Sequence, residues 1–508
     1  IFDEATPASI LAPPKWTLIA RDAFNGTILW KRGLERWHTH LWPLKSGPAQ
    51  LPRRLVASGQ RVYVTLRVDG PLVALDAATG RTVRTYEGTA VTEEVLLDNG
   101  VLFLRVNPQA QVPEQAGIQE ISRAVREPFY DEAPRQIMVL EAETGNVLWT
   151  TRQGVLPGTL AVGAGGVFFH DGQSVVALDR ETGAERWRSE PVERQRELFS
   201  RYMPTLVVYE DVVLFSGQGR GRSGGGAGSG RDQLTALSAK TGAVLWQADH
   251  PPSGYQSPED VLVAGGLVWC GETTGGSGVF TGRDPRTGEV QAEFPPDTDV
   301  FWFHHRCYRG KATENYLLMS RTGTEFVDFR KQQWLVNHWV RGACLYGVMP
   351  ANGLLYAPQH PCACYLETKL SGFNALAPAS AGPRVPPELA GQPRLERGPA
   401  YDGLSAPARD EAAAEQWPTY RADAQRSGRA RTVVVPEVVR RWQADLGGKL
   451  TSPVIAGGQV FVARADTHSV HALDADTGQP KWSFTAGGQV DSPPTIYAGR
   501  VLFGSADG

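Results

Sequence analysis

One short stretch recurs along this chain and limits its possible folds more than any other feature. Its clearest copy, residues 472–482, reads Ala-Leu-Asp-Ala-Asp-Thr-Gly-Gln-Pro-Lys-Trp. Other copies, complete or decayed, place a polar residue shortly before a Thr-Gly or Asn-Gly pair and are marked by Asp22, Asp76, Glu141, Asp179, Ser238 and Asp284. A motif that returns roughly every 40 to 60 residues indicates a repeat architecture, and the blades of β-propellers have this spacing.

Each part of the motif has a physical reason. The apolar residues before Asp474 are typical of a buried strand. The Asp side chain can accept backbone N–H groups and so begin a turn, and Gly478 supplies the positive φ that a tight hairpin needs. Trp482 offers a flat apolar surface to a neighbouring sheet. One such hairpin cannot bury its apolar face alone, so the copies are expected to stack.

Composition agrees with many short strands and excludes several partners. The 508 residues include 56 Gly and 36 Pro, and 41% are hydrophobic. A net charge of −3 gives no basic patch for nucleic acid and no polybasic membrane anchor. No apolar run reaches the length of a membrane-spanning helix. The chain starts at Ile1 without a leader and stops inside a strand-like run, so we expect it to be a piece of a longer polypeptide.

The predicted fold class is all-β. Eight copies of the hairpin precede residue 380, because decayed copies at Asp328 and Asn374 add to the six already marked. We therefore predict an eight-bladed propeller, with seven blades as the alternative, followed by the start of a second propeller. The predicted organisation is a first propeller at 1–378, with an insertion at 107–135, a Gly-rich loop at 218–232 and an irregular region at 300–370, then a linker at 379–415 and the beginning of the second propeller at 416–508.

A known family shares this pattern. The run Ser-Pro-Val-Ile-Ala-Gly-Gly-Gln-Val-Phe-Val at 452–462, followed by the copy at 472–482, resembles the PQQ-like repeat of quinoprotein dehydrogenases and of bacterial outer-membrane assembly propellers. Residues 417–428 are similar to the usual lead-in to such a propeller. More closely, the chain is similar to large bacterial proteins with two PQQ-like propellers in series, through residues 36–43 and 360–365.

The resemblance implies a cellular location and a role. Members of that group often carry a methyltransferase-like domain upstream, but these 508 residues hold no methyltransferase signature. The implied role is a binding or scaffolding module of the cell envelope or periplasm, with a protein or glycan partner on the blade loops. The resemblance does not extend to PQQ binding. Quinoprotein dehydrogenases use adjacent cysteines and a calcium site, whereas Ala363 separates Cys362 from Cys364 and no calcium-ligand set can be matched.

One region concentrates histidines and cysteines and is the candidate metal site. Its possible ligands are His304, His305, Cys307, His338, Cys344, His360, Cys362 and Cys364. Thiolates and imidazoles are ligands of Zn and Cu, and Ca is a further possible cofactor. Structural disulfides, buried thiols or a redox-active thiol pair are the alternative interpretations. Arg306, Arg309 and Arg341 lie among these residues, so an anionic ligand near the central channel is also conceivable, against ordinary salt bridges.

Two functions from different classes follow. The first is a non-catalytic binding or scaffolding propeller of the cell envelope. The second is an oxidoreductase that uses a metal or quinone cofactor at the channel mouth, with residues 304–364 as its site. No nucleophile elbow or His-Glu-x-x-His motif decides between them.

Elemental analysis combined with thiol titration of the purified protein separates the two. For the binding propeller we expect no stoichiometric metal and oxidised thiols. Stoichiometric Cu, Zn or Ca, or a quinone absorbance band, would instead identify the oxidoreductase.

Overall fold

The computed structural model describes most of the β-rich chain. The described residues are 16–35, 51–109, 133–194, 203–217, 232–250, 260–271, 279–295, 308–319, 323–337, 339–343, 346–358, 370, 372–379, 416–430 and 432–506. Within them the chain is almost all β-strand, with short 3-10 turns at Leu51–Arg53 and Ala465–Thr467. The prediction of an all-β fold is therefore confirmed.

The chain divides into two compact units. The first comprises Ile1–Leu18 and Lys31–Pro378, and the second comprises Ile19–Trp30 and Ala379–Gly508. The hairpin of β1 (Trp16–Arg21) and β2 (Ile28–Leu34) is shared between them. Among the described residues, no helix has the length and apolar character needed to cross a membrane.

In the first unit, six four-stranded antiparallel sheets are found in the part of the chain that the structure describes. They are β3–β6 (Leu55–Ser58, Arg61–Thr65, Leu72–Asp76, Thr82–Thr85), β7–β10 (Thr92–Asp98, Val101–Val106, Arg135–Glu141, Val147–Gln153), β11–β14 (Ala161–Gly163, Gly166–His170, Ser174–Asp179, Glu185–Pro191), β15–β18 (Thr205–Tyr209, Val212–Ser216, Asp232–Ser238, Val244–His250), β19–β22 (Leu262–Ala264, Leu267–Gly271, Phe280–Arg283, Val290–Phe294) and β23–β26 (Lys311–Ala312, Tyr316–Met319, Thr324–Asp328, Gln333–Asn337). A three-stranded sheet, β27–β29 (Met349–Ala351, Leu354–Ala357, Asn374–Leu376), follows.

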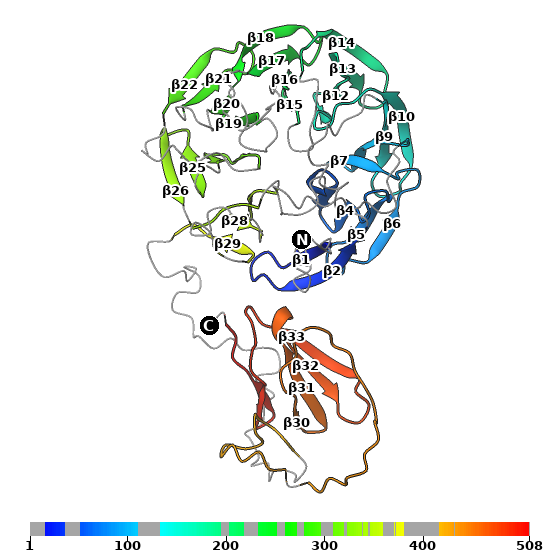
Figure 1. Cartoon of the computed structure of the whole chain (residues 1–508), viewed down its shortest axis with the longest axis vertical. Helices are drawn as coiled ribbons and strands as arrows, with labels where there is room; N and C mark the ends of the chain where they lie inside the picture. Colours follow the sequence, from blue (N-terminus) through cyan, green and yellow to red (C-terminus); the bar gives the residue numbers. More distant parts are fainter. Residues whose placement is uncertain are drawn as a thin grey trace, which may run out of the picture. The chain divides into compact units, whose positions relative to one another are not determined.

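These sheets follow one another around a ring as the blades of a propeller (Figure 1). In each four-stranded sheet, strands that follow one another in sequence are antiparallel neighbours in space. The number of blades, eight or seven, stays a prediction because parts of the chain lie outside the described ranges.

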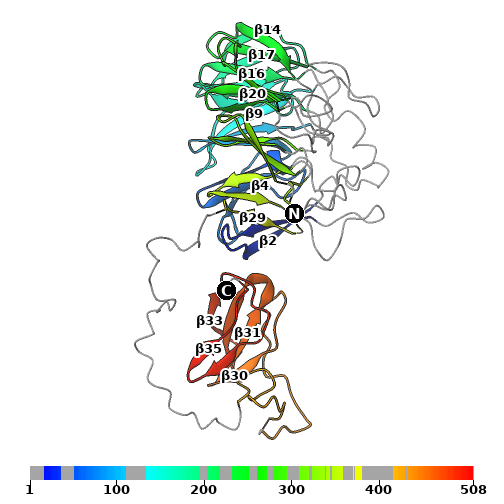
Figure 2. The same ribbon diagram turned by 90° about the vertical axis from the view of Figure 1, so that its left-hand side faces the viewer.

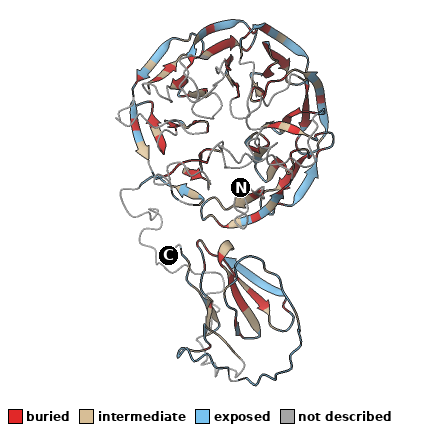
Figure 3. Cartoon of the chain, viewed as in Figure 1, coloured by how far each residue is buried: buried red, intermediate tan, exposed pale blue. Residues whose placement is uncertain are grey.

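Burial is greatest in the two middle strands of each four-stranded sheet and is least in the outer strand. Every residue of β12 and all but the last of β13 are buried, whereas β14 is mostly exposed. Figure 3 shows this change of burial across the sheets. Stacked sheets bury both faces of their central strands, which explains why those strands are continuous apolar runs in the sequence.

The recurrent turn has the structure that the motif predicts. The Oδ1 atom of Asp179 accepts hydrogen bonds from the backbone N–H groups of Glu181 and Thr182 at 3.1 and 2.9 Å, and from Oγ1 of Thr182 at 2.9 Å. Gly183 then adopts φ +71°. Hydrogen bonds from Thr182 are the largest cause of the lowered pKa of Asp179, because they favour its ionised form.

Tryptophans on the fourth strands of three sheets join each of these sheets to the next. Each donates its indole N–H to a backbone carbonyl in the turn between the third and fourth strands of the following sheet. The pairs are Trp149 with Arg180, Trp187 with Ala239 and Trp246 with Pro285, at 2.9 Å in each case. The indole also covers the glycine of that turn, and a Cβ added at Gly242 would lie 2.5 Å from Cε3 of Trp187. We call this arrangement the indole–glycine contact.

One sheet makes an equivalent contact with different residues. Beyond β6, Tyr86 donates its hydroxyl to the carbonyl of Ala142 at 2.5 Å, and its ring lies against Gly145. Ala142 directly follows Glu141, as Arg180 follows Asp179 in the next turn. The contact therefore needs an aromatic ring with a donor, and indole is one way to supply it.

The described part of residues 300–370, a region that the sequence predicted to be irregular, includes regular sheet. The sheet β23–β26 lies in this region, and its last turn still begins at Asp328, whose Oδ1 accepts the N–H groups of Arg330 and Lys331. Gln332 takes the place of the glycine at φ +56°. A β-ladder depends on alternating burial of side chains and therefore tolerates loss of the Thr-Gly signature.

The same repeat organises the second unit. Its sheets are β30–β33 (Val454–Ala456, Gln459–Arg464, Ser469–Asp474, Pro480–Thr485) and β34–β35 (Thr495–Tyr497, Arg500–Leu502). Asp474 accepts the N–H groups of Asp476 and Thr477, as its counterparts do in the first unit. The residues expected to begin a second propeller thus have the predicted blade structure.

Replacement of Gly242 by alanine tests the indole–glycine contact, with Gly100→Ala as the matched control. Both glycines have positive φ, +74° and +78°, but a Cβ at Gly100 would meet nothing within 4 Å. The positive φ should cost roughly 1–2 kcal/mol at either position, and the clash with Trp187 should add about 1–3 kcal/mol at Gly242. Urea unfolding measures both; equal losses would show that the indole does not constrain this turn.

Candidate functional site

The two faces of the ring differ in the length of their connections. In a meander of four antiparallel strands, one face of the ring holds the starts of the first and third strands and the ends of the second and fourth strands. On this face the connection from β8 to β9 takes up residues 107–134 and the one from β14 to β15 takes up 192–204. On the other face β7 and β8 are joined by Asn99 and Gly100 alone. We call these the long-connection face and the short-turn face; Figure 2 views the sheets from the side.

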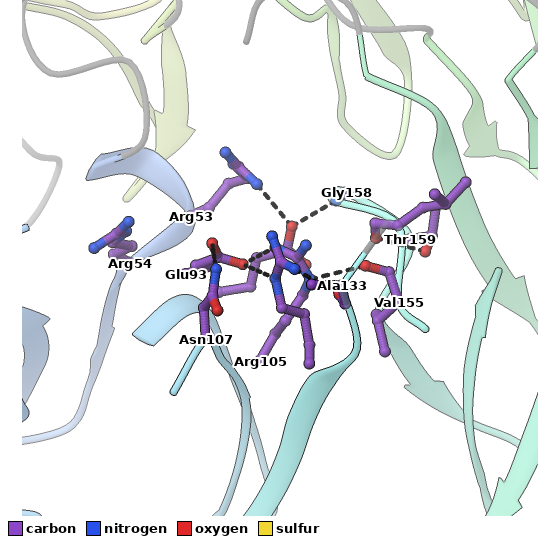
Figure 4. Close-up of polar contacts among 12 residues, drawn as sticks. Arg53, Arg54, Glu93, Arg105, Asn107, Ala133, Val155, Gly158 and Thr159 are labelled. Carbon is purple, nitrogen blue, oxygen red and sulfur yellow. Dashed lines mark hydrogen bonds and ion pairs between the residues drawn. The ribbon is translucent and has the colours of Figure 1, made fainter. Parts of the chain in front are cut away.

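A cluster of charged side chains lies on the long-connection face, at the starts of inner strands (Figure 4). Its members are Arg53, Arg54, Glu93, Glu94, Arg105 and Arg135. We call it the arginine cluster. Arg53 and Arg54 directly precede β3, the two glutamates lie near the start of β7, and the other arginines lie at the end of β8 and the start of β9. Arg54, Arg105 and Arg135 are each 3% exposed or less.

Glu93 is the centre of this cluster. Its Oε2 lies 2.5 Å from Nη1 of Arg105 and accepts a hydrogen bond from Nε of Arg135 at 3.0 Å, while its Oε1 accepts one from Nδ2 of Asn107 at 3.2 Å. Burial works to raise the pKa of Glu93, but the two guanidinium groups outweigh it and lower that pKa to about 2. Glu93 is therefore a fixed anion that holds β8 and β9 to β7.

Glu94 connects three successive sheets. Its Oε1 accepts hydrogen bonds from Nη1 of Arg53 at 2.8 Å and from the backbone N–H of Gly158 at 2.5 Å. Arg53 precedes β3 and Gly158 precedes β11, so one carboxylate bridges the sheets on either side of its own. Arg105 adds a second tie, because its Nε donates to the carbonyl of Val155 at 3.0 Å.

The cluster is electrically unbalanced among its described members. It contains four guanidinium groups and two carboxylates, which leaves two positive charges. Burial lowers the pKa of Arg54 to about 9; Glu93 opposes this, while Arg53 and Arg105 add to it. Burial is therefore the main cause of the lowered pKa of Arg54, and the neighbouring charges act on it in both directions.

Arg309 extends the polar contacts across the same face. It precedes β23, and its Nη1 donates to Oγ1 of Thr205, the first residue of β15, at 2.5 Å. Its neighbour Gly310 donates its backbone N–H to Oδ2 of Asp260, just before β19. Arg309, singled out from the sequence as a possible channel residue, thus contacts the start of an inner strand. Arg341 is 2% exposed, and Arg306 lies outside the described residues.

The predicted metal ligands lie outside the described ranges without exception. They are His304, His305, Cys307, His338, Cys344, His360, Cys362 and Cys364. Cys270, the fifth cysteine, is a buried free thiol in β20. The described residues contain no group of three or more metal-ligating side chains. The metal site, whether for Cu, Zn or Ca, stays a prediction.

The arginine cluster was not predicted from the sequence, although the sequence contains a signal for it. Arg105 interrupts the apolar run Val101–Val106, and adjacent glutamates stand at the start of Thr92–Asp98. A charged residue within a buried strand requires a partner, so each of these positions predicted an ion pair. Only the fold could show that the pairs meet.

One buried histidine, His170, has a structural role. The backbone N–H of Gly172 donates to its Nδ1 at 3.0 Å, so its Nε2 carries the proton and donates to the carbonyl of Val192 at 2.9 Å. Burial lowers the pKa of His170 to about 4. The neutral ring stacks on Phe215 and joins two sheets.

Replacement of Glu93 by glutamine tests the cluster. We expect a loss of about 3–5 kcal/mol at pH 7, because Arg105 and Arg135 lose the carboxylate that compensates them. In the wild type, the contribution of Glu93 is complete above its ordinary pKa of 4.5 and is lost as the pH falls toward its folded pKa of about 2. Urea unfolding should therefore show wild type and variant converging below pH 4.5.

The matched control is Glu210→Gln. Glu210 pairs with Arg286 at 2.8 Å on an exposed surface, so its loss should change stability little at any pH. A Glu93→Gln variant as stable as this control at pH 7 would contradict the role given to the cluster.

A known protein family and one of its members are similar to this chain in sequence. The family described as "Outer membrane protein assembly factor BamB" matches residues 15–221, 133–298 and 429–508, more than half of the chain. The outer membrane protein assembly factor BamB of Burkholderia pseudomallei (strain K96243) is 27% identical over 249 residues, which are 42% of this chain and 60% of that protein. The chain thus spans less than two thirds of the length of this relative.

Solved structures with similar folds include two kinds of protein. BamB from Moraxella catarrhalis has a TM-score of 0.35 and 12% identity, covering 90% of this chain and 94% of its own. The quinohemoprotein alcohol dehydrogenase ADHIIG from Pseudomonas putida HK5 has a TM-score of 0.30 and 14% identity, covering 89% and 69%. These low scores leave the assignment to the sequence match, by which the chain belongs to the BamB-like family of PQQ-like repeat β-propellers.

Proposed function

We propose that this chain is a binding and scaffolding propeller of the bacterial cell envelope, located in the periplasm, and that a protein partner docks on its long-connection face. No catalysis is assigned to it. The observation that carries the proposal is the difference between the two faces. Loops that protrude from a rigid scaffold are where binding residues concentrate, and the described strand ends place every long connection of the ring on one side.

The arginine cluster supports this role as a structural base. Glu94 ties the starts of three successive inner strands together, and Glu93 fixes the strands from which the connection 107–134 begins and ends. A loop with both ends held in this way loses less conformational entropy when it binds. Both carboxylates of the cluster pair with its arginines Arg53, Arg105 and Arg135, as expected for a platform.

Family membership supports the envelope location and a protein partner. The name of the matching family and of the Burkholderia relative refers to assembly of outer membrane proteins. A glycan partner, the other possibility raised by the sequence, has no support among the described residues. The oxidoreductase alternative depends on histidines and cysteines outside the described ranges, so no observation favours it.

Site-specific photo-cross-linking in living bacteria tests the proposal. A benzophenone amino acid is placed at Gln109 and at Pro295, exposed residues that follow β8 and β22 on the long-connection face. Matched controls carry it at Asn99 and at Lys240, exposed residues in turns of the short-turn face. We expect an adduct with one defined envelope protein from the first pair and none from the second.

Two results would contradict the proposal. Adducts formed only from Asn99 or Lys240 would place the partner on the wrong face. An adduct that glycosidase digestion removes and protease digestion does not would identify a glycan as the partner.

A further inference from the structure

Two buried hydrogen-bonding atoms beside the arginine cluster have no partner among the described residues. They are Nε of Arg53 and Oγ1 of Thr65. Thr65 is the last residue of β4 and is fully buried, and Arg53 directly precedes Arg54 and β3 in the same sheet. Buried polar side chains are nearly always hydrogen-bonded, because a bond left unmade costs the desolvation of the group. Two such atoms at one end of one sheet therefore point to a ligand.

The register of the sheet places Thr65 beside the arginines. Leu55 of β3 pairs with Val64 of β4, so Arg54 and Thr65 are the next two residues opposite each other. Side chains opposite each other on antiparallel strands share one face, with Cβ atoms about 5 Å apart. The hydroxyl of Thr65 therefore lies next to the buried side chain of Arg54, and Arg53 is one residue away on the same segment (Figure 4).

The face that carries Thr65 is turned toward the next sheet, β7–β10, from which most of the arginine cluster comes. Tyr63, two residues before Thr65 on β4, belongs to the core shared with β7 and β8, and residues two apart on a strand share a face. The charges of Glu93 and Arg105 act on the pKa of Arg54, as expected if the two sheets meet here. The two unpartnered atoms thus lie at the junction of two sheets, on the long-connection face.

The chemistry of these groups selects an anion. Nε of Arg53 can only donate a hydrogen bond, and the hydroxyl of Thr65 can donate as well. The described members of the cluster carry an excess of two positive charges. Burial also lowers the pKa of Arg54 to about 9, because it disfavours the charged guanidinium. A water molecule would accept the two bonds and leave the charge as it is, whereas an anionic oxygen would accept them and compensate the charge.

Access to this place limits the ligand to a small one. Thr65 and Arg54 are buried, whereas the side chain of Arg53 is 17% exposed and its neighbour Pro52 is exposed. Entry is therefore along Arg53, from the long-connection face. Nη1 of Arg53 donates to Oε1 of Glu94 at 2.8 Å, so its guanidinium is already oriented before a ligand binds, which lowers the entropic cost of binding.

We propose that Arg53, Arg54 and Thr65 form a binding site for a small oxyanion between the sheets β3–β6 and β7–β10. The oxygens of the ligand accept hydrogen bonds from Nε of Arg53 and Oγ1 of Thr65, and the guanidinium of Arg54 compensates their charge. Carboxylates and phosphates both carry such oxygens. The site is independent of the protein partner proposed for the same face.

Equilibrium dialysis of the full chain against labelled inorganic phosphate tests the proposal. The buffer contains sodium chloride, so that an oxyanion must compete with chloride and contacts with exposed arginines are screened. We expect saturable binding of one phosphate per chain. Displacement by acetate would identify a carboxylate as the preferred oxyanion, and retention against acetate would identify a phosphate; both support the site. The absence of saturable binding would overturn it.

Matched threonine variants make the result specific. Thr65→Val keeps the shape of the side chain and removes the hydroxyl, so it should weaken phosphate binding by about tenfold or more. In chloride alone it should leave the midpoint of urea unfolding unchanged or raise it, because the hydroxyl bonds to no described residue. In the control Thr89→Val, an equally buried hydroxyl is lost that donates to the carbonyl of Tyr86 at 2.6 Å and accepts the N–H of Leu72 at 2.9 Å. This control should lower the midpoint and leave phosphate binding unchanged.

Arg53→Lys tests the second donor. Lysine keeps the positive charge near Glu94 but has no Nε–H of the guanidinium type, so phosphate binding should weaken by about tenfold. Phosphate bound equally well by Thr65→Val and wild type would overturn the proposal. So would a lowered midpoint of Thr65→Val in chloride, since it would show that the hydroxyl is already bonded within the protein.

Discussion

The packing of an aromatic ring on the glycine of the next turn is the interaction on which this structure depends. It joins sheets that are otherwise separate hydrogen-bonded units, since each β-ladder is confined to one blade. The contact has a hydrogen bond and a steric part, and both are repeated with nearly the same geometry at Trp149, Trp187 and Trp246. A bare glycine is required because any Cβ would occupy the position of the ring. The repeat is therefore a rule for joining blades as well as for building them.

A second set of ties acts at the opposite end of the sheets. The indole–glycine contacts lie at turns between third and fourth strands, on the outside of the short-turn face. The arginine cluster lies at the starts of the inner strands, on the long-connection face. Glu94 joins three blades there, as the indoles join neighbouring blades at the other end. The sheets β3–β6, β7–β10 and β11–β14 are thus held at diagonally opposite corners, which resists both sliding and opening of this part of the stack. The connection 107–134 begins and ends at strands that the cluster fixes.

The indole–glycine contact also occurs at a place where the described residues contain no complete sheet to carry the tryptophan. Trp442 makes the joining contact although the sheet that should carry it is absent from the described residues. Conversely, the turn at Asp328 keeps its carboxylate cap and its positive φ after losing its glycine to Gln332, and the sheet around it is regular. Turn and contact are therefore separable: the acidic cap builds the hairpin, whereas the glycine is needed where an aromatic ring must pack against it.

Local sequence determined the strands, the turns and the fold class, because alternating burial, an Asp cap and a positive-φ glycine act within a dozen residues of one another. It also identified the tryptophans as the surfaces between blades. It did not determine that Glu93, Arg105 and Arg135 meet, or that Glu94 reaches Gly158 across 64 positions of sequence. Those meetings depend on which strands share a face of the ring and on the order in which blades follow one another. Such positions are set by the packing of whole sheets. A charged side chain within a buried strand indicates that an ion-pair partner must exist, but it does not indicate which distant strand provides that partner.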